Sequence, residues 1–300
     1  MTIPDGIYPT MVTPFTADNK VDYASLEAMV AWYIEHGVHG LFAVCQSSEM
    51  FFLTLQERVR LAHTIIELAG GRISVIASGH ISDRIESQIE EIKAISAVGP
   101  DAFVLVANRL AGEDESEDVF KRNLDAILSA VPDVPLGFYE CPYPYHRLFS
   151  TPLLRHVAET GRFLFLKDTC CDLERITERI QAIAHTNMKI YNANTVFLLA
   201  SLRAGCAGFS GIMGNYHPQF YRWLFDHQAH PRAEEMQLYL SMMGQCLQYP
   251  RSAKFYLSLE GLPILEHSRS NPAVLNAEAK GWTRQLQQLT RQLEAEFGIK

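Results

Sequence analysis

Lys167 follows the apolar segment Phe163–Leu166, and of the eight lysines in the chain it is the one placed at the end of a strand-like run. An unpaired ammonium group is costly to bury, so a lysine in this position needs a reason. Low-dielectric surroundings lower the pKa of a lysine and leave a neutral amine that attacks carbonyl carbons. The structural alternative is a lysine that reaches solvent or pairs with Asp168, and the segment by itself leaves both open.

The segments that would position Lys167 alternate between strand and helix. Short runs rich in Val, Ile and Phe are separated by stretches of helical period, and glycine or proline marks many junctions. The predicted strands are Gly6–Phe15, Gly40–Cys45, Ser74–Gly79, Asp101–Ala107, Pro135–Cys141, Phe163–Thr169, Met188–Ala193 and Ala207–Gly211. The helices include Tyr23–His36, Leu55–Leu68, Ile81–Ala97, Val119–Val131 and, after the eighth strand, Pro218–Asp226. Eight such units predict an α/β fold, the (β/α)8 TIM barrel.

Strand signals stop after residue 230, whereas helical period continues over Pro231–Gln248, Ala253–Gly261 and Asn271–Phe297. We therefore expect a barrel domain over residues 1–230 and a C-terminal α-helical extension over residues 231–300, docked on the barrel. A doubly wound sheet is disfavoured. The turn within the first strand region reads Thr13-Pro14-Phe15-Thr16, which is not a glycine-rich phosphate turn.

The carboxyl ends of the strands carry the active site in barrels of this kind. Polar residues with chemical potential occur at these ends from the second strand onward. In chain order they are Cys45–Glu49, Gly79-His80, Asn108-Arg109, Tyr139–Pro142, Lys167-Asp168, Asn192–Asn194 and Ser210-Gly211. These residues form the short list for a site around Lys167.

Composition excludes several classes of partner. The formal net charge is −8 and no polybasic run is present, which argues against nucleic acid or an anionic membrane as a partner. No apolar stretch approaches the roughly 20 residues of a membrane span. The first residues lack the features of a secretory signal, and the six cysteines show no disulfide framework spacing. We expect reduced thiols and a cytoplasmic protein.

Metal and cofactor motifs are not evident in the sequence. It contains no His-Glu-x-x-His or Cys-x-x-Cys motif, and no dinucleotide-binding fingerprint. A phosphate-cradling glycine loop, as pyridoxal phosphate would need near strands seven and eight, is not evident. We therefore expect neither a metal nor a cofactor, and a metal-dependent class II aldolase is disfavoured.

The strand-end motifs, in order, resemble one known family. The order Thr13-Pro14-Phe15, Ser47-Ser48-Glu49, Tyr139–Pro142 and Leu166–Thr169 is similar to the dihydrodipicolinate synthase / N-acetylneuraminate lyase family of class I aldolases. Lys167 lies 28 positions after Tyr139, and this register is the most specific part of the resemblance. Further matches are Gly37–Gly40, Leu55, Glu57-Arg58, Arg203–Gly211, Asn215 and Pro218.

The resemblance implies a role for each matching residue. Lys167 would form a Schiff base with the keto carbon of pyruvate or another 2-oxo acid, and Tyr139 would move protons. Ser47 and Ser48 would hold the substrate carboxylate, and Ser210 and Gly211 would contact the keto acid from the eighth strand. Glu49 is expected to brace the turn. The resemblance also implies a homotetramer built as a dimer of dimers.

This chain departs from the family at three positions. Gln46 replaces a threonine of the hydroxyl relay to the catalytic tyrosine, and it is kept among the candidate substrate contacts. The tyrosine that many members carry after the fourth strand is missing, because the chain reads Ala107-Asn108-Arg109-Leu110. Pro144 stands where synthase members have an arginine that binds the second substrate. Dihydrodipicolinate synthesis itself is therefore disfavoured.

His80, Arg109, Glu140 and His146 are then the candidates for contacting the second substrate or the distal part of a longer one. Arg109 or His146 could pair with a distal carboxylate, and Glu140 could accept hydrogen bonds from sugar hydroxyls. The predicted function is a Schiff-base lyase of 2-oxo acids, including 2-keto-3-deoxy sugar acids. The alternatives are a 2-keto-3-deoxy acid dehydratase, a dihydrodipicolinate synthase-like condensing enzyme, and a non-catalytic barrel that binds a keto acid.

Overall fold

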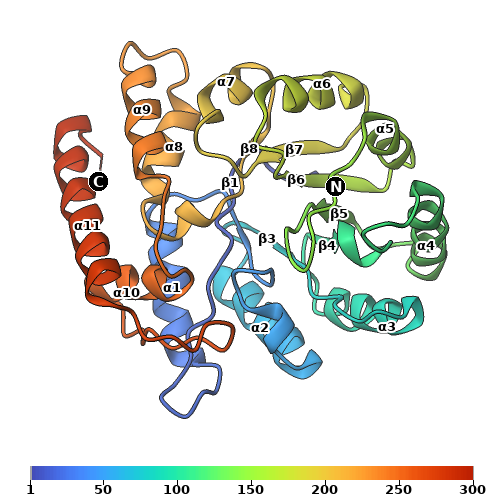
Figure 1. The fold of residues 1–300 in the computed structure, drawn as a ribbon, viewed down its shortest axis with the longest axis horizontal. Helices are drawn as coiled ribbons and strands as arrows, with labels where there is room; N and C mark the ends of the chain where they lie inside the picture. The colour runs from blue at the N-terminus through green and yellow to red at the C-terminus, as the bar shows by residue number, and fades with distance from the viewer. Residues whose placement is uncertain (1, 300) are drawn as a thin grey trace.

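The computed structural model describes residues 2–299 and contains eight parallel strands arranged as a barrel (Figure 1). Neighbouring strands follow the order β1-β8-β7-β6-β5-β4-β3-β2. The ring is completed by an isolated parallel bridge between Thr10, just after β1, and Phe42 of β2. The strands are β1 Gly6–Ile7, β2 Gly40–Phe42, β3 Ser74–Ala77, β4 Ala102–Val106, β5 Leu136–Tyr139, β6 Phe163–Asp168, β7 Lys189–Asn192 and β8 Gly208–Phe209. The predicted TIM barrel is confirmed.

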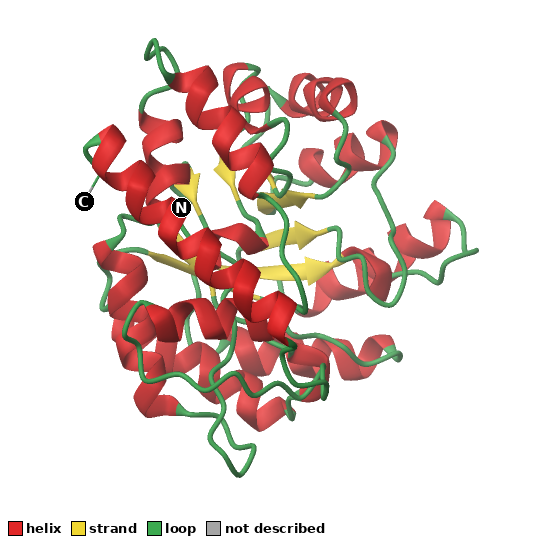
Figure 2. Ribbon diagram, turned by 60° about the vertical axis from the view of Figure 1, so that its left-hand side comes forward, coloured by secondary structure: helices red, strands yellow, loops and turns green. Residues whose placement is uncertain are grey.

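Helices surround the strands in the views of Figures 1 and 2. Those of the barrel are α1 Tyr23–Glu35, α2 Leu55–Ala69, α3 Ile85–Ser96, α4 Glu117–Ala130, α5 Thr151–Glu159, α6 Leu173–Ile183, α7 Leu198–Arg203 and α8 Pro218–Asp226. Three short 3₁₀ helices follow strand ends: η1 Met50–Phe52, η2 Ala107–Arg109 and η3 Ile212–Asn215. The predicted α/β alternation therefore holds along the chain.

Two helices begin later than their periodicity predicts. The backbone amides of Ile81 and Ser82 donate to the Glu91 carboxylate, so this segment is a loop and α3 starts at Ile85. The last helix starts at Ala277 rather than Asn271, because the Asn276 side chain accepts from the Ala279 amide and caps it. Local side-chain acceptors thus shortened both elements.

The barrel interior is filled by large apolar and aromatic side chains. Strands β4 and β6 are buried along their whole length, as their continuous apolar sequence requires in a parallel sheet. At the centre, the rings of Phe165 and Tyr191 stack with centroids 4.3 Å apart, and Tyr8 meets both. This packed layer closes the interior, so that ligand access is confined to the ends of the strands.

The C-terminal helices α9 Ala233–Met243, α10 Arg251–Leu259 and α11 Ala277–Phe297 lie along one side of the barrel (Figure 1). They are joined to it by buried contacts, such as the edge-to-face contact of Tyr216 with Tyr256, whose ring centroids lie 5.3 Å apart. The domain boundary at residue 230 stays a prediction. No helix within residues 2–299 has both the length and the apolar character needed to cross a membrane.

Candidate active site

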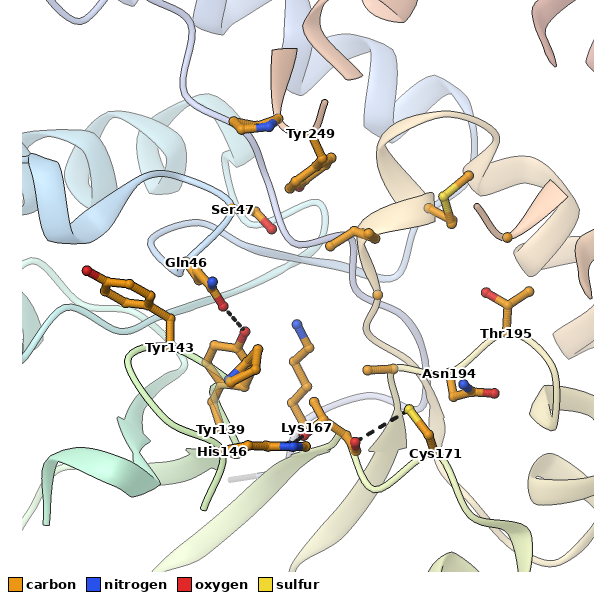
Figure 3. A pocket seen from close by; sticks show the side chains of 18 of the residues that line it. Gln46, Ser47, Tyr139, Tyr143, His146, Lys167, Cys171, Asn194, Thr195 and Tyr249 are labelled. Carbon is orange, nitrogen blue, oxygen red and sulfur yellow. Dashed lines mark hydrogen bonds between the residues drawn. The ribbon is translucent and has the colours of Figure 1, made fainter. Parts of the chain in front are cut away.

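A cavity of about 690 Å³ opens at the carboxyl ends of the strands (Figure 3). It is lined by the strand-end residues Gln46, Tyr139, Lys167 and Gly211, which come from four different strands. Other parts of its wall come from the C-terminal helices and the segments between them. The cavity therefore lies where the fold class places catalytic sites.

Lys167 projects into this cavity from the penultimate position of β6. Its side chain is 4% exposed, and Figure 3 shows it directed between Tyr139 and Gln46 on one side and Asn194 and Thr195 on the other. Burial lowers the pKa of Lys167 to about 8. The neighbouring Asp168 does not neutralise it, because that carboxylate pairs with Arg179. At pH 7 about one-tenth of the amine is therefore unprotonated.

Tyr139 is the neighbour of Lys167 on the adjacent strand. The two residues are register partners in β5 and β6, and Lys167 Nζ lies 4.3 Å from the centroid of the Tyr139 ring. The Tyr139 hydroxyl donates to Gln46 Oε1 at 3.1 Å. Burial raises the pKa of Tyr139 well above its ordinary value. The phenol is therefore protonated, with its proton directed at an amide oxygen.

The two serines of the turn after β2, Ser47 and Ser48, differ in what their hydroxyls contact. Ser47 lines the cavity, and its hydroxyl donates to Thr10 Oγ1 at 3.1 Å. Ser48 does not line it. Its hydroxyl accepts from the Cys45 amide at 3.0 Å and lies 2.9 Å from the Met11 carbonyl. The expectation that Ser48 contacts substrate through its side chain is therefore not supported, because that hydroxyl holds the backbone of the turn.

Glu49 anchors the same turn to the C-terminal part of the chain. Its carboxylate pairs with Lys254 Nζ at 2.6 Å and accepts from the Ser268 hydroxyl and from the backbone amides of Arg269 and Ser270. Burial disfavours the charged form of Glu49, but Lys254 and these donors outweigh it and lower its pKa. The carboxylate braces the turn that carries Ser47, and it is saturated by its own partners.

The end of β8 presents Gly211 but not Ser210 to the cavity. A Cβ atom at Gly211 would lie 2.4 Å from the Phe209 ring and 2.8 Å from the Ala193 carbonyl, so a side chain does not fit there. Ser210 is fully buried, and its hydroxyl has no hydrogen-bond partner within residues 2–299. The close packing explains the glycine, and the Ser210 side chain is placed outside the cavity wall.

His80 and Arg109 lie away from the cavity, contrary to the expectation from their strand-end positions. The His80 ring is buried; its Nε2 accepts from the Val106 amide at 2.6 Å and its Nδ1 contacts Gln88 Oε1 at 2.9 Å. Burial lowers the pKa of His80 to about 4, which keeps the ring neutral. Arg109 turns outward and pairs with Asp83. Neither side chain is available to a substrate.

Glu140 is also committed to the scaffold rather than to the cavity. Its carboxylate pairs with Arg179 at 2.9 Å and accepts from the amides of Phe149 at 2.8 Å and Thr169 at 3.1 Å. Arg179 also binds Asp168, so one buried guanidinium bridges the ends of β5 and β6. The expectation that Glu140 accepts from sugar hydroxyls fails, because its oxygens are already occupied.

His146 does line the cavity, on a loop after β5. Thr169 donates its hydroxyl proton to the Glu140 carbonyl at 2.7 Å, so His146 Nε2–H donates to Thr169 Oγ1, also at 2.7 Å. Burial lowers the pKa of His146. Asn108, from the end of β4, shapes this loop by placing its amide nitrogen within 2.6–2.9 Å of three backbone carbonyls. His146 is therefore a neutral, fixed hydrogen-bonding group.

Reasoning from strand ends missed the walls that come from loops and from the C-terminal helices. Tyr249 lies near Ser47 in Figure 3, and its hydroxyl accepts from Asn215 Nδ2 at 3.2 Å. No periodicity marks this segment, because it joins two helices. Other lining residues outside the earlier expectations are Phe51, Phe52, Tyr143, Thr169, Cys171, Thr195, Val196, Ile212, Met213, Ser241, Gln245 and Ser270. Within residues 2–299, no three His, Cys, Asp or Glu side chains gather in a way that could hold a metal ion.

Comparison with known proteins identifies the family. The model of the dihydrodipicolinate synthetase family matches residues 3–280. The chain belongs to this family. Among its relatives, 4-hydroxy-tetrahydrodipicolinate synthase of Synechocystis is 26% identical over 299 residues, covering 97% of both chains. The enzyme of the same name from Methanococcus maripaludis strain C6 is 27% identical over 229 residues, covering 74% of each.

Solved structures of the family have the same fold. Dihydrodipicolinate synthase from Bacillus anthracis superposes with a TM-score of 0.87 at 21% identity, covering 96% of this chain and 99% of its own. The chloride-inhibited enzyme of Acinetobacter baumannii, solved in complex with pyruvate, gives 0.82 at 25% identity and covers 100% of both chains. The family consists of lyases with a class I aldolase fold, and this chain has that fold throughout.

Proposed function

We propose that this protein is a class I lyase that makes or breaks a carbon–carbon bond at the carbon adjacent to the keto carbon of a 2-oxo acid. The observation that carries the proposal is Lys167. It is a buried amine whose pKa is lowered to about 8, in a cavity and beside a protonated phenol. Two solved family members, from Acinetobacter baumannii and from E. coli K12, hold pyruvate, which supports a 2-oxo acid as the ligand.

The proposed chemistry begins with addition of the neutral Lys167 amine to the keto carbon. The resulting carbinolamine loses water and gives an iminium ion. When a C–C or C–H bond on the adjacent carbon breaks, the iminium accepts its electron pair and an enamine forms. Tyr139, whose ring centroid lies 4.3 Å from Lys167 Nζ, would pass protons to the carbinolamine oxygen and to the departing group, since a phenol both donates and accepts. In the condensing direction the same enamine attacks an aldehyde carbon.

Each wall of the inner cavity then has a defined task. The Ser47 hydroxyl and the turn that Glu49 braces face the position of the substrate carboxylate, near the positive iminium. Gly211, which packs too closely against Phe209 and Ala193 for a side chain, would present only its backbone to the substrate at the end of β8. Gln46 replaces the hydroxyl of the family relay and fixes the orientation of the Tyr139 proton. These assignments make Gln46 a positioning residue for Tyr139.

Synthesis of dihydrodipicolinate is a weaker candidate. Pro144 occupies the position of the family's arginine, and the only other strand-end arginine proposed for this role, Arg109, pairs with Asp83 outside the cavity. A dehydratase would use the same imine and differs only in the bond that breaks next. The homotetramer implied by the family stays a prediction.

Reduction of the imine tests the proposal directly. The intact protein is incubated with pyruvate and borohydride, and its mass is measured against a sample without pyruvate. We expect one reduced pyruvyl group per chain, mapped to the peptide that contains Lys167, and no adduct on a Lys167→Met variant. Folded protein that acquires no adduct would instead identify a barrel that binds a keto acid without covalent chemistry.

A further inference from the structure

The cavity contains very little charge for its volume of about 690 Å³. Of the lining residues within the described chain 2–299, only Glu49 and Lys167 carry a full charge at neutral pH. Glu49 is saturated by Lys254 and by three other donors. The one cation that faces the cavity is therefore the amine that would be consumed in the imine.

Arginines lie around the site, but each is turned away from it. None of them lines the cavity within residues 2–299, because each guanidinium is held by another partner. The partners are Asp83 for Arg109, the Gly112 and Glu115 carbonyls for Arg147, the Phe149 carbonyl for Arg175, and Glu57 for Arg269. A second anionic group on a substrate would therefore meet no counter-charge.

The two sides of the outer cavity suit a neutral molecule. Phe51 and Tyr143 meet edge to face with ring centroids 5.0 Å apart, and Tyr143 is 48% exposed at the opening. Across the cavity from Tyr143, Figure 3 shows Asn194 and Thr195, which offer uncharged hydrogen-bonding groups. His146 adds another neutral polar group. An apolar surface therefore faces a polar but uncharged one.

We propose that the substrate carries no charge beyond its keto-acid carboxylate: the aldehyde that is released or consumed is uncharged. The iminium and the Ser47 turn neutralise the one carboxylate. A distal carboxylate or phosphate would lose its water without gaining a cation, which is strongly unfavourable. This inference rests on the proposed imine chemistry, and it distinguishes the chain from synthases that use an arginine for an anionic second substrate.

The test compares two keto acids of matched shape. Pyruvate with borohydride is trapped first, and this adduct alone decides the proposed function. Trapping is then measured as a function of concentration for 2-oxoglutarate and for 5-methyl-2-oxohexanoate, in which an isopropyl group replaces the distal carboxylate. We expect half-maximal trapping at a concentration about a hundredfold lower for the neutral acid.

A variant with an added charge provides the matched control. Val196 lines the opening and is 50% exposed, so Val196→Arg adds a cation without burying it, and Val196→Gln adds length alone. We expect V196R to reduce the preference for 5-methyl-2-oxohexanoate over 2-oxoglutarate about tenfold, and V196Q to leave that preference unchanged. Equal or better trapping of 2-oxoglutarate by the wild-type protein would overturn the inference, even if pyruvate is trapped. Failure of pyruvate to be trapped would remove the imine and the inference together.

Discussion

Two buried lysines of this protein should respond in opposite ways to the same substitution. Lys167 and Lys254 are 4% and 0% exposed, and burial lowers the pKa of each to about 8, but only Lys254 has a carboxylate partner, Glu49. Replacement by methionine keeps a similar volume and removes the ammonium group. We expect Lys167→Met to stabilise the protein while abolishing imine formation, and Lys254→Met to destabilise it.

The size of the first effect follows from the pKa of Lys167. Lowering the pKa of Lys167 from 10.5 in the unfolded chain to about 8 in the folded protein reduces the free energy of unfolding at neutral pH by about 3 kcal/mol. The pH dependence of this cost follows from proton binding. Below pH 8 the amine of Lys167 is protonated in both the folded and the unfolded state, so the folded state bears the full cost of burying the charge. Between pH 8 and 10.5 only the unfolded state keeps the proton, so the cost disappears as the pH rises. The stabilisation by Lys167→Met should therefore be largest at pH 7 and fade toward pH 10.5.

The second effect has a different origin. Lys254→Met leaves the buried Glu49 carboxylate without its cation, which costs roughly 3–5 kcal/mol in comparable buried pairs. The free energy of unfolding is measured by urea denaturation at pH 7 and pH 10 for the wild type and both variants. A Lys167→Met protein that is less stable than the wild type at pH 7 would refute the account of Lys167 as an unpaired, desolvated amine. A Lys254→Met, Glu49→Gln double variant that regains most of the loss would confirm the origin of the second effect.

Three further predictions concern catalysis and assembly. The rate of pyruvate trapping should rise with pH, reach half its maximum near pH 8 and level off above it, because about one-tenth of Lys167 is neutral at pH 7; an inflection near pH 10 would contradict this. Gln46→Ala should slow the exchange of the pyruvate methyl protons about tenfold, as measured by NMR in deuterated water. Trapping of pyruvate should persist, because the variant loses only the orientation of the Tyr139 hydroxyl. Leu238 and Met242 lie one helical turn apart on α9 and are 59% and 72% exposed, which makes an apolar face on the surface. If this face joins subunits of the expected tetramer, Leu238→Glu should halve the mass found by light scattering. An unchanged mass would exclude this face as an interface.

The amino-acid sequence determined the barrel and the pair at its centre. Each of the eight strands lies inside the range that its apolar run predicted, and all of them are shorter than that range. Parallel strands of a barrel place their ends on one face, and Tyr139 and Lys167, which the family resemblance paired, lie in register at the ends of neighbouring strands. Local periodicity and strand-end position carry this information without any knowledge of distant contacts.

Tertiary structure alone decided which of the polar strand-end residues face the cavity. Glu140 follows Tyr139 as Asp168 follows Lys167, and Arg109 lies just beyond β4, but Glu140 pairs with Arg179 and Arg109 pairs with Asp83. Tyr249 enters the cavity from a segment with no strand signal. The direction of a charged side chain depends on which counter-charge the fold brings near it, and such partners lie far away in the chain. The sequence could therefore identify Lys167 and Tyr139 as the reactive residues, but it could not predict the charge of the cavity wall around them.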